Sequence, residues 1–230
     1  MIKNGTHNPI GVQTLPKDPL RMYRSEQVTL RTVGPHHCHL VVSVSNSQAL
    51  SGDALSSRST EINDESLFTI RLKPFQRLTR DDFLEDFQIN FLGAVHVIQA
   101  CLPNLKKSPT GASILLFSTV AVTTGMPFHA SIAGAKGAVE GLTRSLAAEL
   151  ASRIRVNAIA PSLTDTPLAV NLLSSEEKRQ AAAERHPMKR IGSVQDIARL
   201  ALFLLSDDAG WITGQVFHAD GGMSALRTFK

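Results

Sequence analysis

Residues 112–166 read ASILLFSTVAVTTGMPFHASIAGAKGAVEGLTRSLAAELASRIRVNAIAPSLTDT, and this segment decides the fold. The apolar run ILLF at 114–117 has the length of a buried parallel strand. The Ala-, Leu- and Glu-rich residues 131–151 predict a helix, and the apolar residues 154–160 predict a second strand that ends at Pro161. A strand, a helix and a strand in this order form a βαβ unit, whose crossover is right-handed in nearly all proteins.

The segments on either side continue the same pattern. Thr79 and Asp82 have the spacing of a helix capping box, and the helix that they begin extends to about residue 105. Residues 190–197 open another helix with an apolar face, and residues 212–222 predict a last strand and turn. The apolar positions of the first helix recur at spacings of three and four: Phe83, Phe87, Phe91, Val95 and Ile98.

The composition suits one α/β domain with a real core, since 43% of the 230 residues are hydrophobic and 19% are charged. The net charge of +4 attracts anions such as dinucleotides. No basic run interleaved with aromatic residues predicts a nucleic-acid partner. No stretch has the apolar length of a membrane span, and no signal-peptide pattern opens the chain. With only Cys38 and Cys101, no disulfide framework is expected, which favours a cytoplasmic location.

Residues 1–66 lack this order. Four prolines break the segment into short pieces, and its glycines have no spacing that brings backbone close to a phosphate. The run HLVVSV at 39–44 is the one candidate strand. We therefore expect an irregular or disordered segment at 1–66 and an ordered α/β domain at 67–230.

The cluster HHCH at 36–39 is not expected to bind a metal, because adjacent ligands converge poorly on one ion and no second cluster accompanies it.

Residues 67–224 resemble the short-chain dehydrogenase/reductase family. That family carries a serine after one strand, Tyr-x-x-x-Lys on the next helix, an asparagine on the preceding helix, and a Pro-Gly-x-x-x-Thr turn after the next strand. In register, this chain has Thr119 for the serine with Ser118 beside it, Lys136 for the lysine, Asn90 for the asparagine, and a turn from Pro161 to Thr166 with Ser162 in place of glycine.

The resemblance implies a Rossmann-like, doubly wound parallel sheet with an irregular or incomplete N-terminal half. It implies hydride transfer between NAD or NADP and a small carbonyl or alcohol, in a homodimer or homotetramer whose helices bearing Asn90 and Lys136 pair across a two-fold axis. The implied catalytic residues are Asn90, Thr119 and Lys136. The implied cofactor-binding residues are Asn90, Ser118, Lys136, Pro161 and Thr166.

Two departures leave three functions open. Ile132 occupies the tyrosine position and has no proton to transfer, and the glycine-rich turn T-G-x-x-x-G-x-G is missing. His129 is the nearby titratable side chain that could replace the tyrosine, although a solvent-facing loop histidine is the better interpretation. The chain is therefore an oxidoreductase with an unusual proton donor, a catalytically inactive homologue that serves as a binding or oligomeric partner, or a defective product. On sequence alone, restoring a tyrosine at position 132 is not expected to restore activity.

Overall fold

The computed structural model describes residues 28–32, 38–42 and 72–227. Its centre is a five-stranded sheet in the order β1-β2-β3-β4-β5. β1 runs antiparallel to β2, and the other neighbouring strands are parallel. The strands are β1 (Val28–Thr32), β2 (Cys38–Val42), β3 (Ala112–Phe117), β4 (Ile154–Pro161) and β5 (Val216–Ala219).

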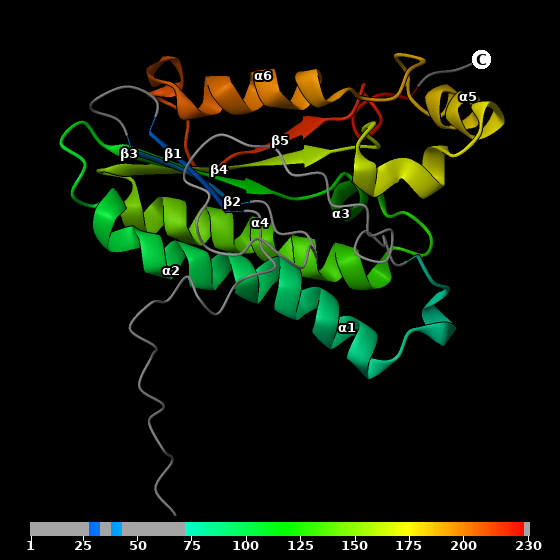
Figure 1. Cartoon of the computed structure of the whole chain (residues 1–230), viewed down its shortest axis with the longest axis horizontal. Coiled ribbons are helices and arrows are strands. Elements are labelled where there is room, and N and C mark those ends of the chain that lie inside the picture. Colours follow the sequence, from blue (N-terminus) through cyan, green and yellow to red (C-terminus); the bar gives the residue numbers. More distant parts are fainter. Residues whose placement is uncertain (1–27, 33–37, 43–71, 228–230) are drawn as a thin grey trace, which may run out of the picture.

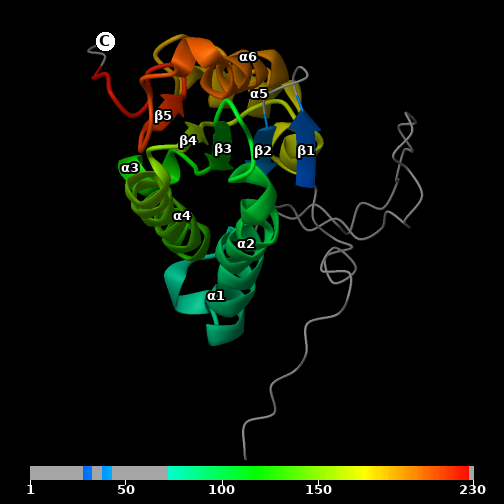
Figure 2. The same ribbon diagram turned by 90° about the vertical axis from the view of Figure 1, so that its left-hand side faces the viewer.

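Helices cover both faces of this sheet. Figures 1 and 2 show α2 and α4 on one face and α6 on the other, while α1 lies beyond α4 on the first side. The α-helices are α1 (Arg80–Phe87), α2 (Gly93–Leu105), α3 (Ala121–Thr124), α4 (Ala130–Leu150), α5 (Glu176–Glu184) and α6 (Val194–Leu205). A π-helical turn, η4 (Gln88–Leu92), joins α1 to α2. Three 3-10 turns complete the list: η3 (Phe75–Arg77), η5 (Pro167–Leu173) and η6 (Asp207–Ala209).

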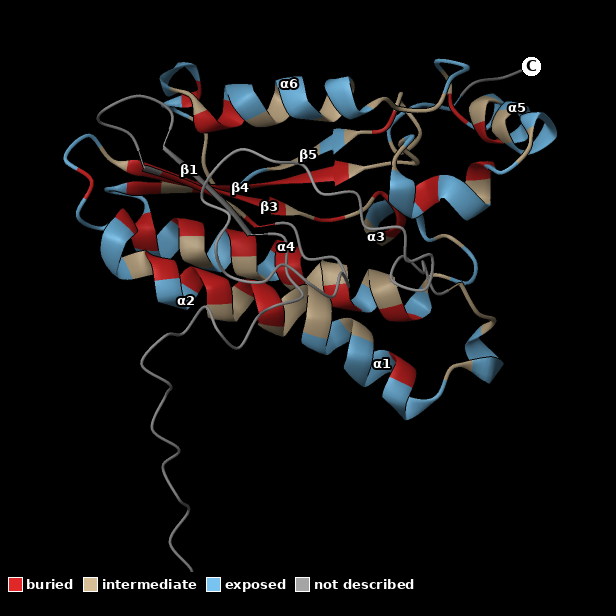
Figure 3. Ribbon diagram, in the orientation of Figure 1, coloured by how far each residue is buried: buried red, intermediate tan, exposed pale blue. Residues whose placement is uncertain are grey.

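The alternation of side chains along β3 divides the core in two. Ile114 and Leu116 belong to the apolar cluster on the side of α2 and α4, and Leu115 packs in the cluster that contains Leu204 and Leu205 of α6. Figure 3 shows β3, β4 and the inner stripes of the helices as buried. Burial on both faces explains why the strands β3 and β4 read as continuous apolar runs.

The fold class predicted from the sequence is confirmed: the chain has a Rossmann-like sheet, parallel from β2 to β5, with helices on both faces. The candidate strand at 39–44 is observed as β2, which lies beside β3. The sheet thus reaches into residues 1–66, because the apolar run at 40–42 pairs with the central strand. Val28–Thr32 of the same segment form β1. The other residues of 1–66, which include 43–44 of the candidate strand, lie outside the described residues, and the division at 66/67 stays a prediction.

Two further features concern the surface and the helices of the described ranges. None of the helices in this part of the chain is both long enough and apolar enough to cross a membrane. Trp211 follows η6 at the end of the α6 region, and its side chain is fully exposed, at 101%.

Candidate active site

Lys136 reaches from α4 to the carboxyl end of β3. Its Nζ donates a hydrogen bond to the Phe117 carbonyl oxygen at 3.1 Å. Removal of the ammonium from water disfavours its charged form, which lowers the pKa of Lys136 from 10.5 to about 8. The ammonium is therefore still protonated at neutral pH, yet it gives up its proton far more readily than an exposed lysine does.

Ile132 lies one helical turn before Lys136 on α4 and is partly buried. Its side chain offers no hydroxyl at the place where the related family carries a tyrosine. Any proton delivered here must come from another group.

Ser118 and Thr119 follow β3 directly, and their hydroxyls have different partners. Ser118 Oγ donates to Glu140 Oε1 on α4 at 2.7 Å, and both residues are buried. Thr119 Oγ1 accepts a hydrogen bond from the Ala121 backbone N–H at 3.3 Å, at the start of α3. Because a hydroxyl both donates and accepts, Thr119 can still donate to a substrate oxygen. The hydroxyl proton of Ser118 is already used in the hydrogen bond to Glu140.

Asn90 lies within the π-helical turn η4. Its Nδ2 donates to the Asp86 carbonyl oxygen at 2.9 Å, one turn earlier. A π-helical turn is a common feature of functional sites in helices. α4, which carries Lys136, packs against this turn, so the two helices meet where the sequence places Asn90.

The turn from Pro161 to Thr166 begins where β4 ends. The Pro161 carbonyl accepts from the Val120 N–H at 3.1 Å, which ties the turn to the loop after β3. Thr166 is the N-cap residue of η5, and its Oγ1 donates to the Thr164 carbonyl at 3.4 Å. Thr119, Lys136 and Pro161 are thus brought together at the carboxyl ends of β3 and β4, which point towards α3 in Figure 1. Ligands of open α/β sheets bind at this edge.

His129 precedes α4 and bonds within its own loop. Its Nδ1 lies 2.7 Å from the Pro127 carbonyl oxygen, which can only accept, so this nitrogen carries the proton. The contact agrees with the interpretation of His129 as a loop residue.

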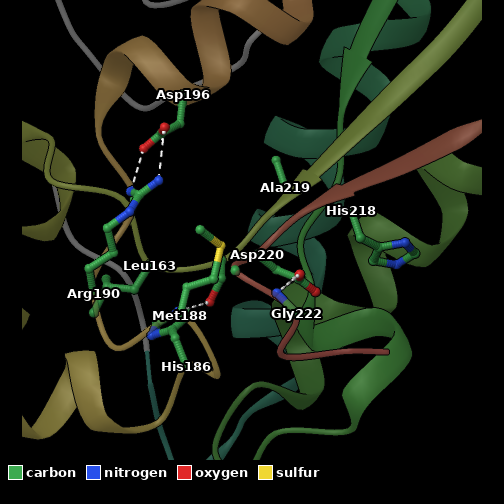
Figure 4. Close-up of a pocket in the computed structure, with 12 residues that line it drawn as sticks. Leu163, His186, Met188, Arg190, Asp196, His218, Ala219, Asp220 and Gly222 are labelled. Atoms are coloured by element: carbon green, nitrogen blue, oxygen red, sulfur yellow. Dashed lines mark hydrogen bonds and ion pairs between the residues drawn. The ribbon is translucent and has the colours of Figure 1, made fainter. Parts of the chain in front are cut away.

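A second group of polar side chains, which the sequence did not reveal, surrounds a cavity of about 250 Å³ beside the ends of β4 and β5 (Figure 4). Ser162 Oγ lies 2.8 Å from His186 Nε2. The sequence marked Ser162 only as a departure from glycine, and no local signal pointed to His186, which lies 24 positions later. The fold brings the two together because α5 returns the chain to the end of β4.

The sheet, its two helical layers and the lysine at the strand ends define a Rossmann-like α/β protein of the dehydrogenase type. Residues 67–224 match the family model described as enoyl-(acyl carrier protein) reductase. The chain belongs to the short-chain dehydrogenase/reductase family.

Relatives of this chain include enzymes and one protein named as inactive. A tropinone reductase homologue of Arabidopsis thaliana is 41% identical over 157 residues, which cover 68% of this chain and 60% of the relative. A Xanthobacter autotrophicus protein named inactive 2-(S)-hydroxypropyl-CoM dehydrogenase 2 is 38% identical over 143 residues, covering 60% of this chain and 62% of the relative.

A solved structure shares the fold. Gluconate 5-dehydrogenase from Burkholderia cenocepacia, in complex with NADP and tartrate, matches with a TM-score of 0.64 at 27% identity, covering 68% of this chain and 62% of the other. The chain spans about 60% of the length of these relatives.

Proposed function

We propose that the protein is an NAD- or NADP-dependent oxidoreductase that interconverts a small carbonyl compound and its alcohol, with Lys136 as the proton donor in place of a tyrosine. Family membership and a solved relative that holds NADP support the class of reaction. The described residues suit the nicotinamide end of such a cofactor, because an ammonium and threonine hydroxyls at the strand ends provide hydrogen-bond donors for its hydroxyl and amide groups.

One observation carries the proposal: the ammonium of the partly buried Lys136 donates to the Phe117 carbonyl oxygen at the carboxyl end of β3. Burial lowers the pKa of Lys136 to about 8, and a general acid works best when its pKa lies near the working pH. A lysine with an ordinary pKa would hold its proton too tightly for this role.

The other residues then have stated roles. Thr119 donates its hydroxyl proton as a hydrogen bond to the carbonyl oxygen and orients it. Lys136 transfers a proton to that oxygen as the carbonyl carbon is reduced. Pro161 and Thr166 border the nicotinamide, and Asn90 supports the helix against which α4 packs. The cofactor, when bound, supplies the hydride.

The test combines cofactor binding with turnover. Calorimetric titration with NADH and NADPH is expected to show binding of one of them, and the full chain is expected to reduce members of an aldehyde and ketone panel. Lys136→Met should lower turnover at least about a hundredfold, while Lys107→Met, at an exposed lysine, should not change it. Equal rates for wild type and Lys136→Met would overturn the proposal.

A second candidate function is a catalytically inactive partner that binds ligand or other subunits without hydride transfer. Ile132 favours this alternative, because it stands at the position of α4 where the family carries its proton-donating tyrosine. The existence of a relative named as inactive is consistent with it. Cofactor binding without turnover would support this candidate, and the absence of both would support a defective product.

We further propose a homodimer or homotetramer in the cytoplasm. Gly134 and Gly141 of α4 are exposed, and outside their own helix no described atom lies within 4 Å of a Cβ built on either. These two small residues therefore leave space for a neighbouring helix. Cys38 and Cys101 are the two cysteines of the chain, too few for a disulfide framework, which suits a reducing compartment.

A further inference from the structure

Ser162 and His186 form a hydrogen-bonded pair, and both line the cavity in which Figure 4 labels His186. Ser162 is the first residue after β4, and His186 follows the last turn of α5. The 2.8 Å separation of Ser162 Oγ and His186 Nε2 is that of a strong hydrogen bond. Nothing in the proposed hydride transfer uses this pair.

The second nitrogen of the ring fixes the direction of that bond. His186 Nδ1 lies 2.8 Å from the Ala182 carbonyl oxygen, and a carbonyl only accepts. Nδ1 therefore carries the proton of the neutral imidazole, and Nε2 accepts from the Ser162 hydroxyl. Met223 Sδ also lies 3.5 Å from Ser162 Oγ, but a thioether at that distance is the weaker acceptor.

This arrangement is that of a serine activated by an oriented base. Because His186 is only 2% exposed, the atoms packed around its imidazole hold the ring in place. Ser162 is partly exposed and lines the cavity, so a small molecule can reach its hydroxyl.

The charges around the cavity have partners among the described residues. Arg190 pairs with Asp196 at 2.7 Å, and the Asp220 carboxylate accepts the backbone N–H groups of Gly222 and Ser224 at 2.9 Å each. His218 Nε2 lies 2.9 Å from Thr123 Oγ1. Because the cation of Arg190 is already neutralised, the cavity favours a neutral ligand over an anion.

We propose that Ser162 and His186 form a second reactive site that accepts and then hydrolyses small, neutral, activated acyl esters. Ser162 Oγ bonds to the acyl carbon while its proton moves to His186 Nε2. The ester C–O bond breaks, and the leaving alcohol takes that proton. Water then attacks the acyl-serine, gives its proton through His186 back to Ser162, and releases the carboxylic acid. No nicotinamide takes part, so the site does not depend on the function proposed above.

The experiment uses the full chain with p-nitrophenyl acetate, followed by release of nitrophenol and by intact-mass spectrometry of the protein. An acetyl adduct on Ser162 is expected before steady turnover. Ser162→Ala should abolish the adduct, and His186→Gln should slow acylation at least about a hundredfold. Ser206→Ala removes a serine whose hydroxyl donates to the Phe203 carbonyl oxygen, and it should acylate at the wild-type rate.

Folding is checked by far-UV circular dichroism of each variant. Should Ser162→Ala fail to fold, Ser162→Gly takes its place, because glycine is the residue that the related turn carries here. An unmodified wild type, an adduct that persists without Ser162, or an unchanged rate in His186→Gln would each show that the pair is a structural tether and would overturn the proposal.

Discussion

The hydroxyl of Ser118 donates a 2.7 Å hydrogen bond to the carboxylate of Glu140, 22 positions later in the chain. This bond joins the loop after β3 to the inner face of α4, and both residues are buried. Arg144 approaches the same carboxylate at 3.5 Å, one helical turn further along α4. Ser118 is thus committed to the contact between loop and helix, and Thr119 is the hydroxyl that remains for a substrate.

Ser118→Ala should therefore destabilise the fold. Loss of one hydrogen bond to a buried carboxylate lowers the free energy of unfolding by about 1–3 kcal/mol. Urea unfolding followed by circular dichroism measures the change in free energy of unfolding. Ser145→Ala, at an exposed position of the same helix, is the control and should stay within about 0.5 kcal/mol of wild type. Equal stability of the two variants would mean that the Glu140 contact contributes nothing.

Lys136 should make the stability of the protein depend on pH in the alkaline range. Burial lowers the pKa of Lys136 from 10.5 to about 8, so between these values the unfolded chain binds more protons than the folded chain. Stability then rises with pH through this window, and below about pH 8 the cost of the buried charge is fully present. The full difference between the two pKa values corresponds to about 3 kcal/mol.

Lys136→Met has no titrating group at this position and isolates the effect. The free energy of unfolding of the variant minus that of wild type should be about 2–3 kcal/mol larger at about pH 7 than at about pH 10. Urea unfolding at both pH values measures this difference. A difference between wild type and variant that stays constant across this range would show that Lys136 is not desolvated.

Ile132→Tyr separates the two candidate functions. A phenol one turn before Lys136 would lie near an ammonium that lowers its pKa, and the proposed oxidoreductase should gain about a hundredfold in carbonyl reduction. Ile132→Phe adds a ring without the hydroxyl and should give no gain. Equal rates for the Tyr and Phe variants would favour the inactive partner, which is also the result expected from the missing glycine-rich turn.

Gly141→Leu tests the proposed oligomer. A Cβ at this exposed position of α4 would have no described atom within 4 Å outside the backbone of its own helix, so Gly141→Leu should leave the monomer folded and should block close approach of a second helix. Sedimentation velocity is expected to show the wild type as an oligomer and the variant as a monomer. Ala181→Leu places the same side chain on an exposed position of α5 and should keep the wild-type mass. A monomeric wild type would reject the oligomer.

The sequence predicted the elements whose periodicity is strong. The strands β3 and β4 are apolar on both faces, and the helix between them is rich in good helix formers, so hydrophobic pattern alone identified all three. β2 was recognised only as a candidate strand, because a run of five residues does not reveal its partner in a sheet. β1 was not predicted at all, and its place in the sheet depends on pairing with β2.

The site residues could be predicted only where the spacing of the family's motif located them in the sequence. Lys136, Thr119 and Asn90 were located by their spacing, but spacing did not show that Ser118 would turn towards Glu140. His186 lies in a polar segment after α5 without any motif, and only the return of the chain to the end of β4 reveals its contact with Ser162. Contacts made by distant segments depend on the fold and leave no local pattern.

The full exposure of Trp211 sets the optical behaviour of the protein, because it is the single tryptophan of the chain. Its indole ring is already surrounded by water in the native state, so unfolding has no apolar environment to take away from it. Intrinsic emission should stay nearly constant through a denaturant titration. A blue shift would instead report that something has covered the surface beside η6, which makes this residue a built-in probe of docking at that corner of the molecule.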